Sequence, residues 1–193
     1  MEHFLTLQGE GVHSGKVSYF LRLAGCDVGC VWCDVKESWQ VENSQWKSYK
    51  DIKDMLKGFL GEIVVVTGGE PCMYDLNPLT KALKSLGKQT HIETSGAYPL
   101  SGNWDWITFS PKKFKSPLPE FYANCHELKV VVFHKSDIAW AEEHAKKVNP
   151  QARLLLQPEW SRKEAMLPLI LEYIYKNPKW SLSLQTHKYI GIE

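Results

Sequence analysis

The sequence predicts one α/β domain whose largely parallel sheet curves into an open, partial (β/α)6 barrel. Apolar, β-branched runs alternate with segments of helical periodicity along the 193 residues, which is typical of strands joined by crossover helices. Two connections, residues 97–105 and 111–125, are instead broken by prolines. Six core strands therefore have fewer than six crossover helices, and we expect some outer helices to be missing. The length suits a single domain spanning residues 1–193.

The expected strands are short and rich in valine, isoleucine, leucine and threonine. Residues 63–66 read Ile-Val-Val-Val, a continuous run that indicates a strand covered on both faces. The core strands are residues 18–23, 62–67, 89–94, 106–110, 127–133 and 153–157, and a last short strand is residues 181–185.

Two helices are expected in the first half of the chain. Residues 49–60 place their apolar side chains on one face, with Ser48 as the N-cap. Residues 77–86 begin with Asn77 as cap and Pro78 in the first turn. The apolar face of the first helix consists of Ile52, Met55, Leu56, Phe59 and Leu60.

Two further helices are expected in the second half. Ser136 is predicted to cap a helix that ends at residue 148. Ser161 and Glu164 form a capping-box pattern for a helix to about residue 175, which Pro168 is expected to bend.

Composition narrows the class of protein. The formal net charge of +1 gives no electrostatic reason to expect a nucleic-acid or membrane partner. No signal peptide opens the chain, and no apolar run approaches the roughly 20 residues that span a bilayer. Five cysteines, an odd number with clustered spacing, argue against a secreted disulfide scaffold. We therefore expect a cytoplasmic protein.

Three cysteines are concentrated in residues 25–34, which read GCDVGCVWCD. Cys26, Cys30 and Cys33 can turn three sulfurs toward one centre, and no fourth cysteine lies nearby. Thiolates at this density bind zinc or an iron–sulfur cluster. Three thiolates on a four-iron cube leave one iron open for a small molecule. The alternative is a zinc site that a distant histidine completes.

The spacing Cys-x3-Cys-x-aromatic-Cys, with Trp32 as the aromatic residue, resembles the cluster loop of the radical S-adenosylmethionine (SAM) enzymes. The resemblance implies a [4Fe–4S] cluster on the three cysteines, with SAM bound to the open iron. It also implies that the reduced cluster cleaves SAM to a 5′-deoxyadenosyl radical. An electron donor such as flavodoxin or ferredoxin is then required.

Unusual polar segments follow five of the expected strands, and the carboxyl ends of parallel strands share one rim. The Gly-Gly-Glu turn at residues 68–70 resembles the radical SAM motif that holds the methionyl amine. The resemblance implies SAM contacts by further residues at these strand ends. The implied SAM-binding residues are Trp32, Asp34, Gly68, Gly69, Glu70, Glu93, Ser95, Ser110, Pro111, Lys112, Gln157 and Pro158.

Motifs at both ends of the chain indicate which family of radical SAM enzymes the sequence resembles. Residues 7–11, Leu-Gln-Gly-Glu-Gly, and the Gln-x-His-Lys segment that begins the tail at residue 185 resemble the 7-carboxy-7-deazaguanine synthases. These enzymes contract the ring of 6-carboxy-5,6,7,8-tetrahydropterin with loss of ammonia, on the route to queuosine. The resemblance implies a homodimer, and a tail at residues 185–193 that closes over the substrate. The implied substrate-binding residues are Leu7, Gln8, Gly9, Glu10, Arg22, Thr67, His187 and Glu193.

Arg22 has the opposite side-chain phase to Tyr19, Leu21 and Leu23, so we expect it to point into the barrel. A buried guanidinium needs an anion, because leaving it unpaired costs several kcal/mol. Its partner is either a substrate carboxylate or Glu10.

Two residues depart from the family pattern. Val35 stands where the family commonly has a threonine whose hydroxyl binds magnesium, and valine cannot bind a hard cation. Magnesium is then held by Asp34, held by water and substrate, or absent. Glu193 replaces the usual terminal proline.

Two other functions share part of this pattern. A glycyl-radical-enzyme activase would have the same cluster loop but would need an open groove for a peptide. A zinc- or cluster-binding interaction module would not need the Gly-Gly-Glu and Ser-Pro-Lys turns.

Overall fold

The computed structural model describes residues 2–192 and contains one curved sheet with the strand order β1-β2-β3-β4-β5-β6-β7-β8. β1 pairs antiparallel with β2, and every following pair is parallel. The strands are β1 (Glu2–Leu7), β2 (Val17–Leu23), β3 (Ile63–Gly68), β4 (Gln89–Thr94), β5 (Trp106–Phe109), β6 (Glu127–Val132), β7 (Arg153–Pro158) and β8 (Trp180–Leu182).

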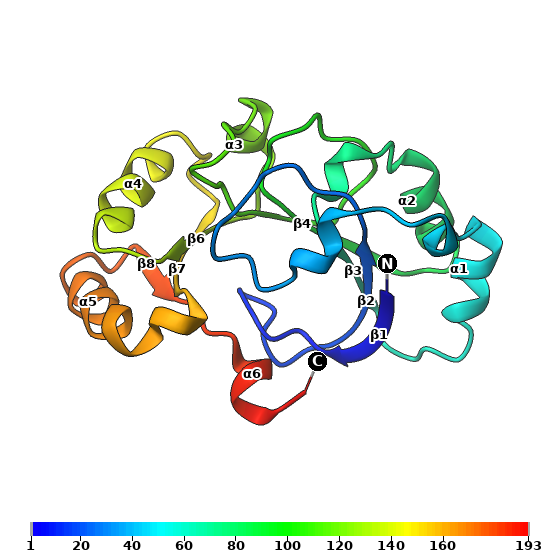
Figure 1. Ribbon diagram of the computed structural model, residues 1–193, viewed down its shortest axis with the longest axis horizontal. Helices are drawn as coiled ribbons and strands as arrows, with labels where there is room; N and C mark the ends of the chain where they lie inside the picture. The colour runs from blue at the N-terminus through cyan, green and yellow to red at the C-terminus, as the bar shows by residue number, and fades with distance from the viewer. Residues whose placement is uncertain (1, 193) are drawn as a thin grey trace.

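The sheet curves around a central space, with the larger helices on its outer side (Figure 1). β1 and β8 form the two edges, so within residues 2–192 the sheet stays open. This confirms the predicted open barrel. The α-helices are α1 (Tyr49–Met55), α2 (Asn77–Lys84), α3 (Glu120–Asn124), α4 (Ser136–Ala145), α5 (Lys163–Lys176) and α6 (Thr186–Ile190). Single 3-10 turns are η1 (Lys36–Trp39), η2 (Asn43–Gln45), η3 (Pro71–Met73) and η4 (Trp160–Arg162).

β3 is buried on both faces, as its β-branched run predicted. Val64 and Val66 belong to the main core, which also includes residues of α2 and the 49–59 segment. Ile63 and Val65 point to the other face, where they pack with Phe20. Alternate side chains of one strand thus fill two separate apolar clusters, and β3 needs apolar residues at every position.

Each strand expected from the sequence exists, with ends shifted by about one residue at most except in β8, which ends at Leu182 rather than at residue 185. Two elements were not predicted. β1 was missed because its half-exposed sequence, EHFLTL, has neither a continuous apolar run nor a strong alternation. α3 lies in a connection that we expected to be non-helical, and its five residues follow Pro119 directly. The segment 97–105 contains no helix, as expected.

The first helix is shorter than its periodicity predicted. α1 ends at Met55, and Gly58 then adopts a left-handed φ of 80°. Leu60 therefore points to solvent, with 96% of its surface exposed, whereas Leu56 is 4% exposed. The predicted cap is correct, because Ser48 Oγ accepts a hydrogen bond from Asp51 N at 3.1 Å.

The other helix caps differ from the prediction. Asn77 is the first helical residue of α2, so it is not the cap. Ser136 makes no capping bond at α4, where Asp137 instead accepts from the Phe133 and His134 amides. Before α5, Glu159 accepts from the backbone of η4. Carboxylates replaced the predicted hydroxyl caps at α4 and before α5, and both residue types can satisfy free amides at a helix start.

In the part of the chain that the structure describes, no helix combines the length and apolar character needed to cross a membrane.

The contrast between Leu56 and Leu60 can be tested by unfolding in urea. Leu56→Ala should lower the free energy of unfolding by about 2–5 kcal/mol, because it removes a buried side chain and leaves a cavity. Leu60→Ala should change it by less than about 0.5 kcal/mol. Equal effects of the two substitutions would contradict the early end of α1.

Candidate active site

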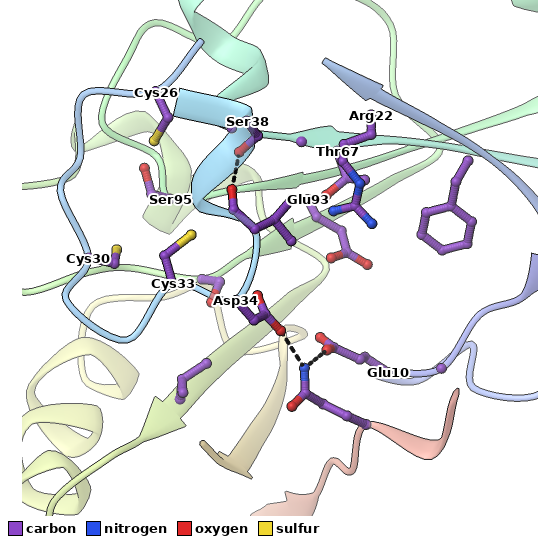
Figure 2. Close-up of a pocket in the computed structure, with 18 of the residues that line it drawn as sticks. Glu10, Arg22, Cys26, Cys30, Cys33, Asp34, Ser38, Thr67, Glu93 and Ser95 are labelled. Carbon is purple, nitrogen blue, oxygen red and sulfur yellow. Dashed lines mark hydrogen bonds between the residues drawn. The ribbon is translucent and has the colours of Figure 1, made fainter. Parts of the chain in front are cut away.

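One cavity of about 560 Å³ lies inside the barrel, and segments far apart in the sequence form its walls (Figure 2). The cysteine loop forms one wall, and the loop between β1 and β2, with α6, forms another. Pro111 and Pro158 do not line this cavity, and Glu193 lies outside the described residues. The predicted site residues that line it are Leu7, Gln8, Gly9, Glu10, Arg22, Cys26, Cys30, Trp32, Cys33, Asp34, Thr67, Gly68, Gly69, Glu70, Glu93, Ser95, Ser110, Lys112, Gln157 and His187.

The three clustered cysteines line the same wall, and Figure 2 shows their sulfur atoms around one end of the cavity. Burial raises the pKa of the Cys26 thiol and raises that of Cys30 to about 11. Metal ions deprotonate such thiols on binding. Three half-buried or buried thiols on one short loop are a donor set that fits an iron–sulfur cluster. Cys72 and Cys125 are buried elsewhere and do not line the cavity.

The Gly68–Gly69 pair brings bare backbone against the start of the cysteine loop. Gly69 N donates to Leu23 O at 2.9 Å, and Glu70 N donates to Gly25 O at 2.8 Å. A Cβ atom on Gly69 would lie 2.2 Å from the Gly25 carbonyl oxygen, and one on Gly68 would lie 2.1 Å from that of Leu23. Only glycine therefore permits this approach.

Glu70 lines the cavity, but its carboxylate is hydrogen-bonded by the protein itself. Its side chain is buried, and one carboxylate oxygen accepts from Cys72 N at 3.0 Å and Thr94 Oγ1 at 2.6 Å. The other oxygen accepts from Ser95 N at 2.9 Å and Ser95 Oγ at 2.5 Å. Glu70 thus connects the carboxyl ends of β3 and β4 next to the cysteine loop.

A buried lysine stands at the centre of the opposite wall. Lys129 on β6 forms an ion pair with Glu10, and its Nζ lies 3.6 Å from Glu93 Oε2. Glu93 Oε1 accepts from Gln8 Nε2 at 2.9 Å. Burial would raise the pKa of Glu10, but the Lys129 ammonium, with hydrogen bonds from Gln185 and Gln157, lowers it to about 2. Glu10 is therefore a hydrogen-bond acceptor only.

The C-terminal segment contacts both walls. Thr186 donates to Gly9 O through its N and its Oγ1, both at 2.9 Å, so α6 lies against the loop between β1 and β2 (Figure 1). Gln185 Nε2 donates to Glu10 Oε1 at 2.8 Å and to Asp34 Oδ2 at 3.3 Å (Figure 2). Lys188 Nζ donates to the same Asp34 oxygen at 2.6 Å. The segment thereby joins the loop that bears Glu10 to the loop that bears the cysteines.

Arg22 lines the cavity as expected, but Glu10 is not its partner. Arg22 Nε donates to Glu2 Oε1 at 2.5 Å, and its guanidinium lies over the Phe4 ring at 5.6 Å. Of the two alternatives for the partner of Arg22, the ion pair with Glu10 is wrong, because Glu10 pairs with Lys129 on β6.

Lys112 lies beside the cysteine wall. Its Nζ donates to Ser110 Oγ at 2.6 Å and lies 5.5 Å from the Trp32 ring. Burial lowers the pKa of Lys112. The ammonium and the indole thus lie side by side at the edge of the cysteine loop.

The residues beside Cys33 do not fit a magnesium ion. Val35 offers no side-chain oxygen, and its carbonyl accepts from Ser38 Oγ at 2.7 Å (Figure 2). The Asp34 carboxylate is bound by Lys188. Across residues 2–192, no group of three or more His, Cys, Asp or Glu side chains is arranged to hold a single metal ion.

Known proteins match nearly the whole chain. A model of the Radical SAM superfamily matches residues 21–114. A 7-carboxy-7-deazaguanine synthase of Flavobacterium psychrophilum is 53% identical over 193 residues, which cover 100% of this chain and 91% of the relative. The chain belongs to the 7-carboxy-7-deazaguanine synthase family. A family member from Synechocystis sp. is 47% identical over 191 residues, which cover 99% of this chain and 91% of the relative.

The fold agrees with this assignment. The crystal structure of QueE from Escherichia coli matches with a TM-score of 0.85 at 32% identity, covering 96% of this chain and 92% of that chain. The radical SAM type of barrel is therefore confirmed, and the family implies a [4Fe–4S] cluster and SAM as cofactors. Neither a peptide activase nor a non-enzymatic zinc module fits a 7-carboxy-7-deazaguanine synthase family that covers the whole chain.

Several residues of the cavity were missed from the sequence. Lys129, Gln185, Lys188 and Trp160 all line it. One signal was available for Lys129, because a lone lysine in the strand sequence ELKVVV requires a buried anion. Gln185 and Lys188 belong to the tail motif, but no neighbouring residue in the sequence identifies Asp34 as their partner.

The cysteine assignment predicts how iron content responds to substitution. Anaerobic reconstitution should give about four irons per chain. Cys72→Ala combined with Cys125→Ala should leave that number unchanged, because neither thiol lines the cavity, whereas Cys30→Ala should lose the cluster. Iron analysis and the visible absorption spectrum measure both outcomes. Loss of iron in the double variant would contradict the assignment.

Proposed function

We propose that the chain contracts the ring of 6-carboxy-5,6,7,8-tetrahydropterin to 7-carboxy-7-deazaguanine with loss of ammonia. The observation that carries this proposal is that one cavity is lined both by the three cysteine thiols and by Gln8, Glu10 and His187. The full-length similarity to enzymes named for this product supports it. When bound, the reduced cluster and SAM supply a 5′-deoxyadenosyl radical that takes a hydrogen atom from the substrate.

The cysteine wall would bind the cofactors. Cys26, Cys30 and Cys33 would hold the cluster, and the Gly68–Gly69 backbone lies against the same loop, where it can contact the amino group of SAM. The remaining assigned SAM contacts stay a proposal carried by the family resemblance. Glu70 has a different role here, because its carboxylate holds Ser95 and Thr94 in place.

The opposite wall would orient the pterin. Arg22 can exchange its partially exposed ion pair with Glu2 for the substrate carboxylate, because such surface pairs contribute little, about 0–1 kcal/mol. Glu10 is ionised at any working pH, so it can accept hydrogen bonds from the N–H donors of the pterin ring. Glu93 lies beside Gln8 and Lys129. These neighbours support a substrate contact for Glu93, in place of the SAM contact that the resemblance implies.

The C-terminal segment would shield the bound substrate from water. It bridges Glu10 and Asp34, so it spans the cavity between the two walls. Exclusion of water and fixed orientation matter, because a radical reacts with whatever group lies nearest.

The proposal also covers the electron donor, the oligomeric state and the cellular location of the enzyme. An acidic one-electron donor such as flavodoxin or ferredoxin would reduce the cluster, and the enzyme would act as a homodimer in the cytoplasm without nucleic-acid or membrane partners. The net charge of +1 is in keeping with a small-molecule enzyme of this kind.

The decisive assay follows product formation from the pterin. Reconstituted protein with SAM and dithionite should form 7-carboxy-7-deazaguanine, detected by mass spectrometry, in amounts that exceed the enzyme. Arg22→Lys should abolish turnover, because a lysine cannot copy a two-pronged grip on a carboxylate.

The matched control is Glu2→Gln, which removes the resting partner of Arg22 and should retain turnover. Slow cleavage of SAM without substrate should persist in both variants. Wild-type protein that cleaves SAM but never converts the pterin would refute the proposed substrate.

Magnesium dependence is expected to be weak. Activity after chelator treatment should recover without added magnesium, because Val35 supplies no oxygen ligand and Asp34 is paired with Lys188. Val35→Thr should make activity rise with magnesium concentration. A strict magnesium requirement in the unmodified protein would contradict this reasoning.

A further inference from the structure

The inner face of β6 carries two charged side chains in a strand that is otherwise apolar. Glu127, Lys129 and Val131 alternate on this face, and Lys129 is 3% exposed while Glu127 is 2% exposed. A charge buried this deeply is stable only with a hydrogen-bonded partner. Both residues find that partner in the loop between β1 and β2.

Lys129 binds the side chains of this loop. Its ammonium is paired with Glu10 and lies 3.6 Å from Glu93, which in turn accepts from Gln8. One ammonium therefore determines the position of Glu10 directly and that of Gln8 through Glu93.

Glu127 binds the backbone of the same loop. Its Oε2 accepts from Val12 N at 3.0 Å, and its Oε1 accepts from Thr108 Oγ1 at 2.9 Å. A Cβ atom on Gly11 would lie 2.4 Å from Glu127 Oε1, and Gly11 has a φ of +68°. The carboxylate therefore occupies the space that a side chain at residue 11 would need, so the loop can follow this path only with glycine there.

We propose that Lys129 and Glu127 are positioning residues, with which β6 holds residues 8–12 inside the barrel so that Gln8 and Glu10 face the pterin. The role assigned to Gln8 and Glu10 rests on the proposed function, but the anchoring of the loop does not.

The other contacts of this loop do not balance the charge of the Glu10 carboxylate. Gly11 N donates to Ser183 Oγ at 3.0 Å, and Thr186 holds Gly9 from the tail. Neither contact touches the Glu10 carboxylate. Gln185 and Gln157 do, but neutral amides cannot balance its charge.

Removing the ammonium would leave carboxylates from three segments in one lumen. Glu10 comes from the loop, Glu93 from β4 and Glu127 from β6. The other charged groups that interact with Glu10 are Asp34, Lys112 and, when protonated, His187. Negative charges on neighbouring carboxylates disfavour the ionisation of one another and so raise their pKa values. Burial already acts to raise the pKa of Glu10, so without Lys129 this pKa should rise far above its present value of about 2.

The first test is Lys129→Met, which keeps the length of the side chain and removes its charge. The KM for the pterin should rise at least about thirtyfold, as for loss of one partner of a buried charge pair. Cleavage of SAM without substrate should remain. The pH profile of kcat/KM should gain an acid limb, because activity then falls as the pH drops through the raised pKa of Glu10.

A double-mutant cycle with Glu10→Gln tests whether Lys129→Met raises the KM through Glu10. If Lys129 acts through Glu10, then adding Lys129→Met to Glu10→Gln should cost little more, and the new acid limb should be absent. Additive losses would overturn this part of the proposal. Lys146→Met is the surface control, because Lys146 is exposed and pairs only with Glu143.

Glu127 offers a matched pair of substitutions. Glu127→Gln keeps an oxygen that can accept from Val12 N, so the KM for the pterin should change little. Glu127→Leu cannot accept, and the KM should rise about as in Lys129→Met. Equal behaviour of the two variants would overturn the role assigned to Glu127.

Hydrogen exchange separates this proposal from the proposed function. Amides of residues 8–16 should exchange faster in Lys129→Met and Glu127→Leu, with the core strands unchanged, whether or not the pterin is the substrate. Unchanged exchange in that loop would overturn the anchoring. Faster exchange together with no wild-type pterin turnover would refute only the substrate.

Discussion

The parallel pairing of β2 through β8 places the carboxyl end of each strand at one rim, and the site depends on this arrangement. Residues far apart in the sequence meet there because each crossover returns the chain to the same edge. Glu70 follows β3 and connects its end to that of β4, since its buried carboxylate accepts hydrogen bonds from Thr94 and Ser95. The cysteine loop rests on that connection through Gly25.

How much could be predicted from the sequence depended on the range of the interaction. The strands and the Ser48 cap are set by neighbours within a few residues, and their prediction is confirmed. The partners of charged groups were not predictable in this way. Glu10 lies 119 residues from Lys129, and Asp34 lies 154 residues from Lys188. Strand order alone does not say which inward side chains will be close enough to pair.

Arg22 illustrates this limit. Its phase on β2 correctly placed it in the cavity, because alternation is a local property. Its partner came from β1, a strand that the pattern of the first seven residues did not indicate. Because this edge strand was missed, Glu2 was not among the candidate partners of Arg22, and Glu10 pairs with Lys129 instead.

The two walls of the cavity are held by different kinds of interaction. Backbone hydrogen bonds and glycine contacts hold the start of the cysteine loop, and the partly exposed ion pairs Asp27–Lys115 and Asp34–Lys188 add to them. Charges hold the wall with Glu10, and the low dielectric of the barrel makes those charges strong only while they remain balanced. A substrate that brings its own carboxylate changes that balance, and Arg22 on β2 is a cation that lines the cavity and can compensate for it. Lys129 and Arg22 therefore have different roles. Lys129 keeps a buried partner and maintains the shape of the wall. Arg22 has a partly exposed partner that it can exchange for a ligand.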